Sequence, residues 1–200
     1  MHPILLATKN PGKVREITSI LSGLPVRITS LTELPDSPDV VEDGETLEAN
    51  ALKKASEIYA RFRLPTIADD SGLEVFALGM RPGVLSARYA GEHVSYDENN
   101  LKLLRELSNV PPGARKARFR CVAAFVAAGV VRTAEGICAG SIPERPEGEG
   151  GFGYDPLFIP DGYDRTFAQL SAGIKNRISH RAIAFLQMKE ILREYVNNFP

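Results

Sequence analysis

The sequence has few cysteines and no long apolar run. Its 200 residues include only two cysteines, Cys121 and Cys138. Both lie in apolar runs without the spacing of metal ligands, so we expect buried thiols and a cytoplasmic, reducing location. No apolar run approaches the roughly 18 residues that span a bilayer, and no signal peptide is apparent at the N-terminus. A membrane partner is therefore not expected.

An excess of charge of either sign is also missing. The chain has 24 Lys and Arg residues against 25 Asp and Glu residues, a net charge of −1 at pH 7. Broad attraction to nucleic acid is therefore not expected, and any basic site must be local. With 44% hydrophobic and 24% charged residues, the composition is that of a globular protein. The length predicts one domain, residues 1–200, with a proper core.

A glycine-rich aromatic loop lies near the C-terminal end, at Phe152-Gly153-Tyr154-Asp155-Pro156. Glycine lets the backbone come close to a ligand, so Phe152 could stack on a flat ring while Asp155 and Arg181 read its polar edge. Arg181 and Lys175 could hold anionic groups. This combination suggests a nucleotide site. The same residues are also typical of a tight loop with an aromatic residue in the core, because Gly, Asp and Pro are common in turns.

Two acidic segments could form a second half of such a site. The short strand at residues 66–68 is followed by Asp69-Asp70-Ser71-Gly72, and Glu42-Asp43-Gly44-Glu45 lies upstream. Adjacent carboxylates at a strand end point to opposite sides, so one can face a cleft while the other caps a turn. Carboxylates from two loops suit Mg²⁺. An Asx-turn explains the Asp-Asp-Ser-Gly letters about as well.

The N-terminal segment resembles a phosphate site in outline. A buried strand at residues 4–7 is followed by the polar turn Thr8-Lys9-Asn10-Pro11-Gly12-Lys13 and then by a helix. Such a helix start presents backbone N–H groups to anions, and Lys13 adds a charge. The spacing of a Walker loop is absent. An ordinary strand–helix connection with a solvated lysine remains the alternative.

The remaining periodicities predict an α/β fold, a mixed central sheet with helices on both sides. One helix, over residues 45–62, should carry an apolar stripe of Leu47, Ala51, Ala55, Ile58 and Phe62, with Glu48, Lys54 and Glu57 on its other face. Further expected elements are strands at 26–30 and 73–78, a loop at 32–45, a helix at 97–107, a long hairpin at 117–128 and 130–142, and a last helix at 181–197.

Taken together, the motifs resemble the inosine triphosphate pyrophosphatase family, the dITP/XTP or non-canonical purine nucleoside triphosphate pyrophosphatases. The matching stretches run almost end to end: residues 7–13 with Glu16, 48–55, 68–73, Pro82-Gly83 with residues 86–89, 150–156 and 179–181. One departure is Glu48-Ala49-Asn50-Ala51, where the family often has Glu-Asn-Ala.

The resemblance implies hydrolysis of the α–β phosphoanhydride of ITP, dITP or XTP, giving a nucleoside monophosphate and pyrophosphate. It also implies Mg²⁺ dependence, two lobes around a substrate cleft, and a homodimer. By the same resemblance Glu42 and Asp70 hold the metal, and Asp70 accepts the proton of the attacking water. Asp69 is expected to cap a turn instead.

The remaining roles follow the chemistry of the side chains. Lys13, Lys54 and Lys175 are expected at the phosphates, although Lys54 could be a plain solvated helix residue. Phe152 should stack on the base, and Asp155, His180 and Arg181 should read the purine edge, although His180 could instead be a helix-start residue without a ligand. The full substrate-binding set is Thr8, Lys9, Asn10, Pro11, Gly12, Lys13, Lys54, Ser71, Phe152, Gly153, Tyr154, Asp155, Lys175, His180 and Arg181.

Two other functions stay open at this point. One is a related pyrophosphatase acting on pyrimidine or modified nucleotides, which assays of base specificity would distinguish. The other is a nucleotide-binding regulatory module without turnover. The set of Glu42, Asp69 and Asp70 argues against a module, because a binder needs no carboxylate to activate water.

Overall fold

The computed structural model describes residues 1–34 and 36–198. It is a mixed α/β structure, as predicted, with a central sheet in the order β2-β1-β3-β5-β6-β7 and β4 added to β3. The strands are β1 (His2–Leu6), β2 (Val26–Ser30), β3 (Thr66–Val75), β4 (Arg81–Pro82), β5 (Lys116–Ala127), β6 (Val130–Ser141) and β7 (Ile159–Pro160). Strands β2, β1 and β3 are parallel, whereas β4 and β7 are antiparallel to their neighbours.

The chain divides into two compact units that share the long strands. Unit 1 comprises residues 1–70, 121–136 and 181–200, and unit 2 comprises residues 71–120 and 137–180. The boundary falls inside β3, β5 and β6, so each of these strands supplies residues to both units.

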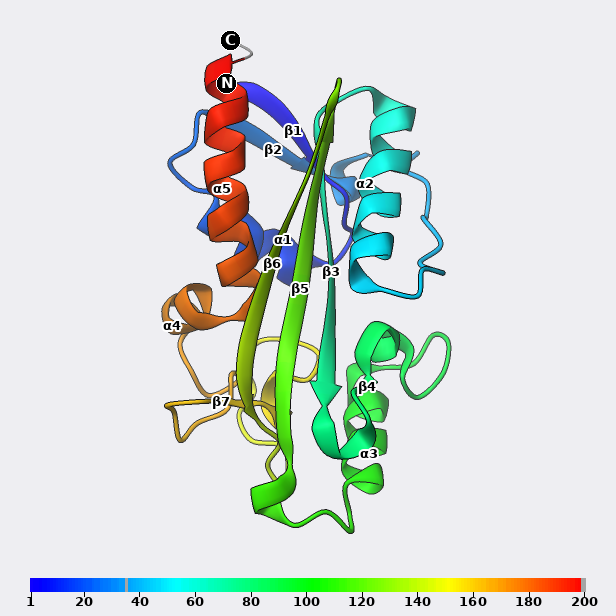
Figure 1. Cartoon of the computed structure of the whole chain (residues 1–200), viewed down its shortest axis with the longest axis vertical. Helices are drawn as coiled ribbons and strands as arrows, with labels where there is room; N and C mark the ends of the chain where they lie inside the picture. Colours follow the sequence, from blue (N-terminus) through cyan, green and yellow to red (C-terminus); the bar gives the residue numbers. More distant parts are fainter. Residues whose placement is uncertain (35, 199–200) are drawn as a thin grey trace. The chain divides into compact units, whose positions relative to one another are not determined.

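Unit 1 buries both faces of its part of the sheet. Its helices are α1 (Pro11–Ile20), α2 (Leu47–Phe62) and α5 (His180–Asn198), and Figure 1 shows α2 and α5 on opposite sides of the strands. Ile4 and Leu6 pack with Phe125 and Phe185 in one cluster, whereas Leu5 is buried outside that cluster. Alternate residues of β1 thus meet opposite layers, which is the pattern of a strand covered on both faces.

Local caps decide where the helices of unit 1 begin. The Asn10 side chain accepts hydrogen bonds from the backbone N–H groups of Gly12 and Lys13, and Pro11 occupies the first helical position. The polar turn predicted up to Lys13 is therefore shorter, because helix α1 already starts at Pro11. Helix α2 starts after Thr46, whose hydroxyl accepts from the Ala49 N–H.

Unit 2 packs around aromatic side chains. Phe119, Phe158 and Phe167 form a buried group with ring centroids 4.7 to 6.2 Å apart. Its helices are α3 (Tyr96–Glu106), which was predicted at residues 97–107, and the short α4 (Ala172–Ile178), which was not predicted. Among the described residues, no helix has the length and low polarity needed to cross a bilayer.

Two expectations about the region around the acidic motif are wrong. The predicted break after residue 68 is absent, because β3 runs without interruption from Thr66 to Val75 and includes Asp69 and Asp70. The predicted strand at 73–78 is only its last part. Lys54 was expected on the helix face opposite the apolar stripe, yet it is buried, as are Ala51 and Ala55 of that stripe.

Candidate functional site

Asp70 is the buried acidic group of unit 1 whose proton affinity is raised. Its side chain lies in β3, is 6% exposed, and accepts a hydrogen bond from Asn50 Nδ2 at 3.0 Å. Burial raises the pKa of Asp70, Lys13 opposes this effect, and the negative charge of Glu42 raises the pKa further. A carboxylate in this condition accepts a proton more readily than one in water.

Asp69, the preceding residue, has the opposite environment. Its side chain is fully buried, with Lys13 Nζ at 3.1 Å and Arg181 Nη2 at 3.1 Å from Oδ2. Burial alone would raise its pKa, but the charges of Lys13 and Arg181 outweigh burial and hold the pKa well below its usual range. The predicted turn-capping role of Asp69 is wrong, because the residue lies in mid-strand at the centre of an ion cluster.

Arg181 completes that cluster from the start of α5. Its guanidinium donates to Asp69 Oδ2 through Nε at 3.2 Å and through Nη2 at 3.1 Å, and to Glu16 Oε2 through Nη1 at 2.7 Å. Burial opposes the charge on Arg181, yet the two carboxylates raise its pKa. These contacts tie α1, β3 and α5 together within unit 1.

Lys54 forms a second ion pair, with Glu42 of the loop before α2. Burial opposes the positive charge on Lys54, but the charges of Glu42, Asp69 and Asp70 outweigh it and raise the pKa of Lys54. The neighbouring Lys53 instead reaches Asp43 at 2.6 Å on the surface. Lys54 is therefore part of a charged interior site, and not a plain solvated helix residue.

The N-terminal loop contributes polar groups to the same unit. Thr8 Oγ1 accepts from the Asn10 N–H at 3.2 Å, and Lys9 Nζ contacts Asp39 Oδ1 at 2.7 Å on the surface. Gly12 is buried in the first turn of α1, whereas Pro11 is exposed. Lys13, in the first turn of α1, contacts Asp69 of strand β3 through its Nζ at 3.1 Å.

The carboxylates of unit 1 fit a hard cation. Glu42 and Asp70 offer oxygen ligands from a loop and a strand, and beyond the effect of burial the Glu42 charge raises the pKa of Asp70. Within residues 1–34 and 36–198, no group of three or more His, Cys, Asp or Glu side chains is arranged to hold a metal ion. Mg²⁺ commonly uses one or two protein carboxylates, while water and substrate phosphate complete its shell. The donor pair fits that kind of site.

In unit 2, the loop at Phe152 is held by a buried ion pair. Asp155 is 3% exposed, and its Oδ2 accepts from the Phe152 N–H at 2.8 Å and from Lys175 Nζ. Lys175 Nζ also lies 4.8 Å from the centroid of the half-buried Phe152 ring. A Cβ at Gly151, where φ is +74°, would lie 2.0 Å from Asp155 Oδ2, so this position requires glycine.

Tyr154 and His180, two other predicted residues of unit 2, are buried in its core, whereas Ser71 is not. The Tyr154 hydroxyl donates to the Ser86 carbonyl at 3.0 Å, and Tyr154 is buried. The His180 ring stacks on Phe119 with centroids 4.5 Å apart and planes 12° apart, and it is 3% exposed. Ser71 is half-buried in β3.

The candidate residues thus form two groups, one in each unit. Unit 1 brings together Lys13, Glu42, Lys54, Asp70 and Arg181, and unit 2 brings together Phe152, Asp155 and Lys175. A common cleft between the two groups stays a prediction.

Asn50 and Glu16 were missed as site residues, although both lie in the motifs that carry the resemblance. Asn50 binds Asp70 with its amide nitrogen and accepts from the Gly44 N–H at 2.7 Å. Glu16 binds Arg181.

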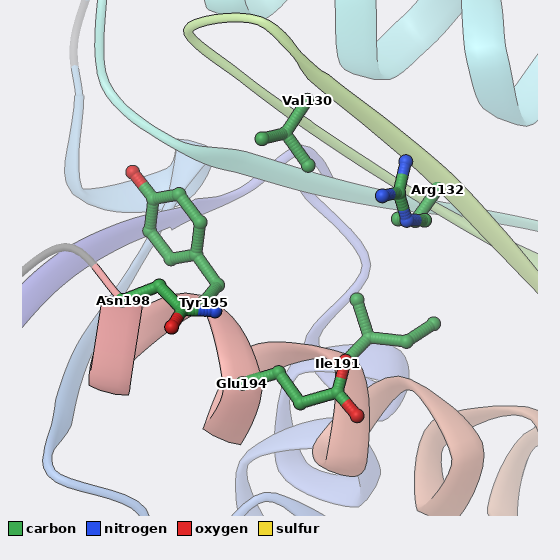
Figure 2. A pocket seen from close by; sticks show the side chains of 6 residues that line it. All are labelled: Val130, Arg132, Ile191, Glu194, Tyr195 and Asn198. Carbon is green, nitrogen blue, oxygen red and sulfur yellow. The ribbon is translucent and has the colours of Figure 1, made fainter.

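A hollow of unit 1 with a volume of about 110 Å³ lies between β6 and α5. Figure 2 shows the side chains that line it. Ligand pockets for small molecules typically measure about 300–1,000 Å³, so this hollow is too small for a nucleotide. None of its lining residues belongs to the predicted site. They are Val130, Arg132, Ile191, Glu194, Tyr195 and Asn198.

Comparisons with known proteins agree over the whole chain. A sequence model of the Ham1 family matches residues 4–191. The chain is 50% identical over 193 residues to the dITP/XTP pyrophosphatase of Geobacter sulfurreducens, and the aligned region covers 96% of this chain and 97% of the relative. It is 49% identical to the dITP/XTP pyrophosphatase of Geobacillus kaustophilus, with 98% and 97% covered. A solved HAM1 protein from Coxiella burnetii matches with a TM-score of 0.88 at 38% identity, covering 97% of this chain and all of that one.

Proposed function

Because the chain belongs to the Ham1 family, we propose that it is a dITP/XTP pyrophosphatase that hydrolyses non-canonical purine nucleoside triphosphates, including ITP. Water would cleave the α–β phosphoanhydride to give a nucleoside monophosphate and pyrophosphate, which removes the non-canonical compound from the pool of nucleoside triphosphates. We also propose that it acts as a cytoplasmic homodimer.

The observation that carries this proposal is the environment of Asp70. A buried carboxylate with a raised pKa, fixed by Asn50 at 3.0 Å, is suited to orient a water molecule and accept its proton. The Asn50 bond limits rotation of the carboxylate, so its second oxygen has a defined direction. A regulatory module that only binds nucleotide has no need of such a group.

The cations of unit 1 would hold the polyphosphate. Lys13 and Lys54 are now paired with Asp69 and Glu42, and phosphate oxygens would share or replace these partners. Glu42 and Asp70 would hold Mg²⁺, which supplies screening of the negative charge that repels the attacking water. Thr8, Asn10 and Ser71 would add hydrogen bonds to phosphate or sugar.

The loop of unit 2 would bind the base. Phe152 would stack on the purine, because a base offers its flat face to an aromatic ring whatever its substituents. Asp155 and Lys175 hold this loop, which supports a role in shaping the base site; a phosphate contact of Lys175 stays a prediction. His180 and Arg181 are proposed to read the 6-keto group, because a donor there pairs with keto oxygen and not with the amino group of adenine.

The test is release of pyrophosphate from ITP, dITP, XTP and ATP, with Mg²⁺ and with a chelator. We expect release from the keto purines, dependence on Mg²⁺, and little release from ATP. Pyrimidine triphosphates are included because a related pyrophosphatase would prefer them. Tight nucleotide binding without any release would favour a binding module.

A further inference from the structure

One face of helix α3 contacts the stacking loop of unit 2. Tyr96 and Asn100 are four residues apart, so their side chains lie on the same side of the helix. The Tyr96 ring centroid lies 6.3 Å from that of Phe152, with the planes 43° apart. Asn100 Nδ2 donates to the Gly153 carbonyl at 3.1 Å. Neighbouring turns of one helix thus touch two consecutive residues of the loop.

Hydrogen bonds hold the backbone on both sides of the Phe152 ring. The Phe152 N–H donates to Asp155 Oδ2 at 2.8 Å, and the Gly153 carbonyl accepts from Asn100. Gly153 has φ at +63° and no side chain, so this residue has many accessible conformations when nothing restrains it. Asn100 supplies the restraint on that side, and with it a limit on the direction of the ring.

Stability alone does not account for an asparagine at position 100. The residue is 6% exposed, and its Oδ1 atom is buried without a hydrogen-bond partner in the part of the chain that the structure describes. A buried acceptor without a donor destabilises a fold, and an apolar side chain of similar size would avoid that penalty. What the amide adds is the bond to Gly153.

We propose that Asn100 is a positioning residue for the purine base. It fixes the Gly153 carbonyl and thereby the orientation of Phe152, while Tyr96 limits the swing of the same ring. The inference rests on the proposed function, since it takes Phe152 as the platform for the base. It adds α3 to the elements that determine affinity for nucleotides.

The test begins with Asn100→Leu, which removes the amide and keeps most of the volume. We expect KM for ITP and for ATP to rise about 5- to 10-fold, at the lower end of what loss of base stacking produces. The kcat should change little, inhibition by inorganic pyrophosphate should be unchanged, and the melting temperature should be equal or higher. Asn100→Ala, which removes the same bond without adding bulk, is measured in parallel in case leucine prevents folding.

Asn99 provides a matched control on the same helix. It is 2% exposed, and its amide makes two bonds away from the loop, accepting from the Ala90 N–H at 2.7 Å and donating to the Ala87 carbonyl at 3.1 Å. Asn99→Leu should therefore lower the melting temperature and leave KM at the wild-type value. The same pattern for Asn100→Leu would overturn the proposal in favour of a structural role.

A double-mutant cycle tests whether Asn100 acts through the ring. In a Phe152→Ala background, Asn100→Leu should give no further rise in KM. Full additivity of the two changes would overturn the proposal. Binding of inosine monophosphate by calorimetry separates this inference from the proposed function, because it needs no turnover. Equal Kd values for wild type and Asn100→Leu would reject the role of Asn100, whereas weaker binding by the variant would support it even if the wild-type protein released no pyrophosphate.

Discussion

Removal of the Arg181 side chain should destabilise unit 1 strongly, because it breaks a buried ion cluster. The Arg181 and Asp69 side chains are 3% and 0% exposed, and the guanidinium makes two bonds to Asp69 and one to Glu16. Deleting one partner of a buried pair typically costs about 3–5 kcal/mol. Lys13 remains 3.1 Å from Asp69 in the variant, so we expect the lower end, about 3 kcal/mol.

Thermal and urea unfolding of Arg181→Ala would measure this loss. For a chain of this length, about 3 kcal/mol corresponds to a fall in Tm of roughly 6 to 12 °C. Arg193→Ala is the control, because Arg193 lies on the same helix in a surface pair with Glu190, with side chains 50% and 62% exposed. The free energy of unfolding of this control should stay within about 0.5 kcal/mol of the wild-type value. An Arg181→Ala loss as small as that of the control would refute the reasoning.

The pH dependence of the loss provides a second check. The pKa of Asp69 in the folded protein lies below the unfolded value of about 3.9. Ionised Asp69 therefore contributes stability above about pH 4, and this contribution disappears as the pH falls toward the folded pKa. Without Arg181 the folded pKa returns upward, so the variant has less of this stability to lose. The difference in free energy of unfolding between wild type and Arg181→Ala, measured in the presence of a chelator, should therefore become smaller as the pH falls. A difference that does not change with pH would contradict the assignment.

Measurements of activity and binding on four variants test the proposed roles of the site residues. Asp70→Asn should keep the fold and nucleotide binding but lower turnover by at least ~10²–10⁴-fold, as loss of a general base does, and near-wild-type turnover at saturating Mg²⁺ would exclude that role. Lys54→Ala should weaken binding of ITP by roughly 1.5–3 kcal/mol and binding of the monophosphate much less, whereas the surface control Lys53→Ala should change neither Kd. Phe152→Ala should raise KM for all purines alike, because stacking does not depend on the identity of the base. Arg181→Ala should lower the ratio of kcat/KM for ITP to kcat/KM for ATP by about 10- to 100-fold. An equal fall of kcat/KM for both substrates would show that Arg181 does not recognise the base.

The sequence predicted best those elements whose pattern is long and local. The hairpin around Gly129, strand β2 at Val26–Ser30 and the last helix follow the expected ranges closely. In each case the period of apolar residues extends over several turns or a full strand, and nearby glycine or capping residues mark the ends. Helix α4 escaped because seven residues give too short a period to recognise.

The acidic motif was misread because its letters are those of a turn. Asp-Asp-Ser-Gly satisfies its carboxylates locally in a turn, but here Asp69 reaches Arg181, which is 112 positions away, and Lys13, which is 56 positions away. These distant partners replace the local hydrogen bonds and let β3 continue. A single sequence does not indicate which distant lysine or arginine will pair with a given carboxylate.

Lys54 could have been placed better from the sequence. Asn50 and Lys54 fall on the i, i+4 spacing of the buried stripe that contains Ala51, Ala55 and Ile58. The prediction placed Lys54 on the opposite face of the helix and so did not use this alignment. A polar pair on an apolar stripe indicates a buried polar contact, and the structure supplies Asp70 and Glu42 as the partners.

The two consecutive aspartates illustrate how one strand prepares two different acids. Successive side chains of a strand point to opposite faces, so Asp69 meets Lys13 and Arg181 while Asp70 meets Asn50 and the charge of Glu42. The pKa of Asp69 is lowered and that of Asp70 is raised. Divergent pKa values in neighbouring carboxylates separate a permanent charge from a group that can accept a proton. A shift of β3 by one residue would exchange the two environments, so the uninterrupted strand is itself a condition for the proposed chemistry.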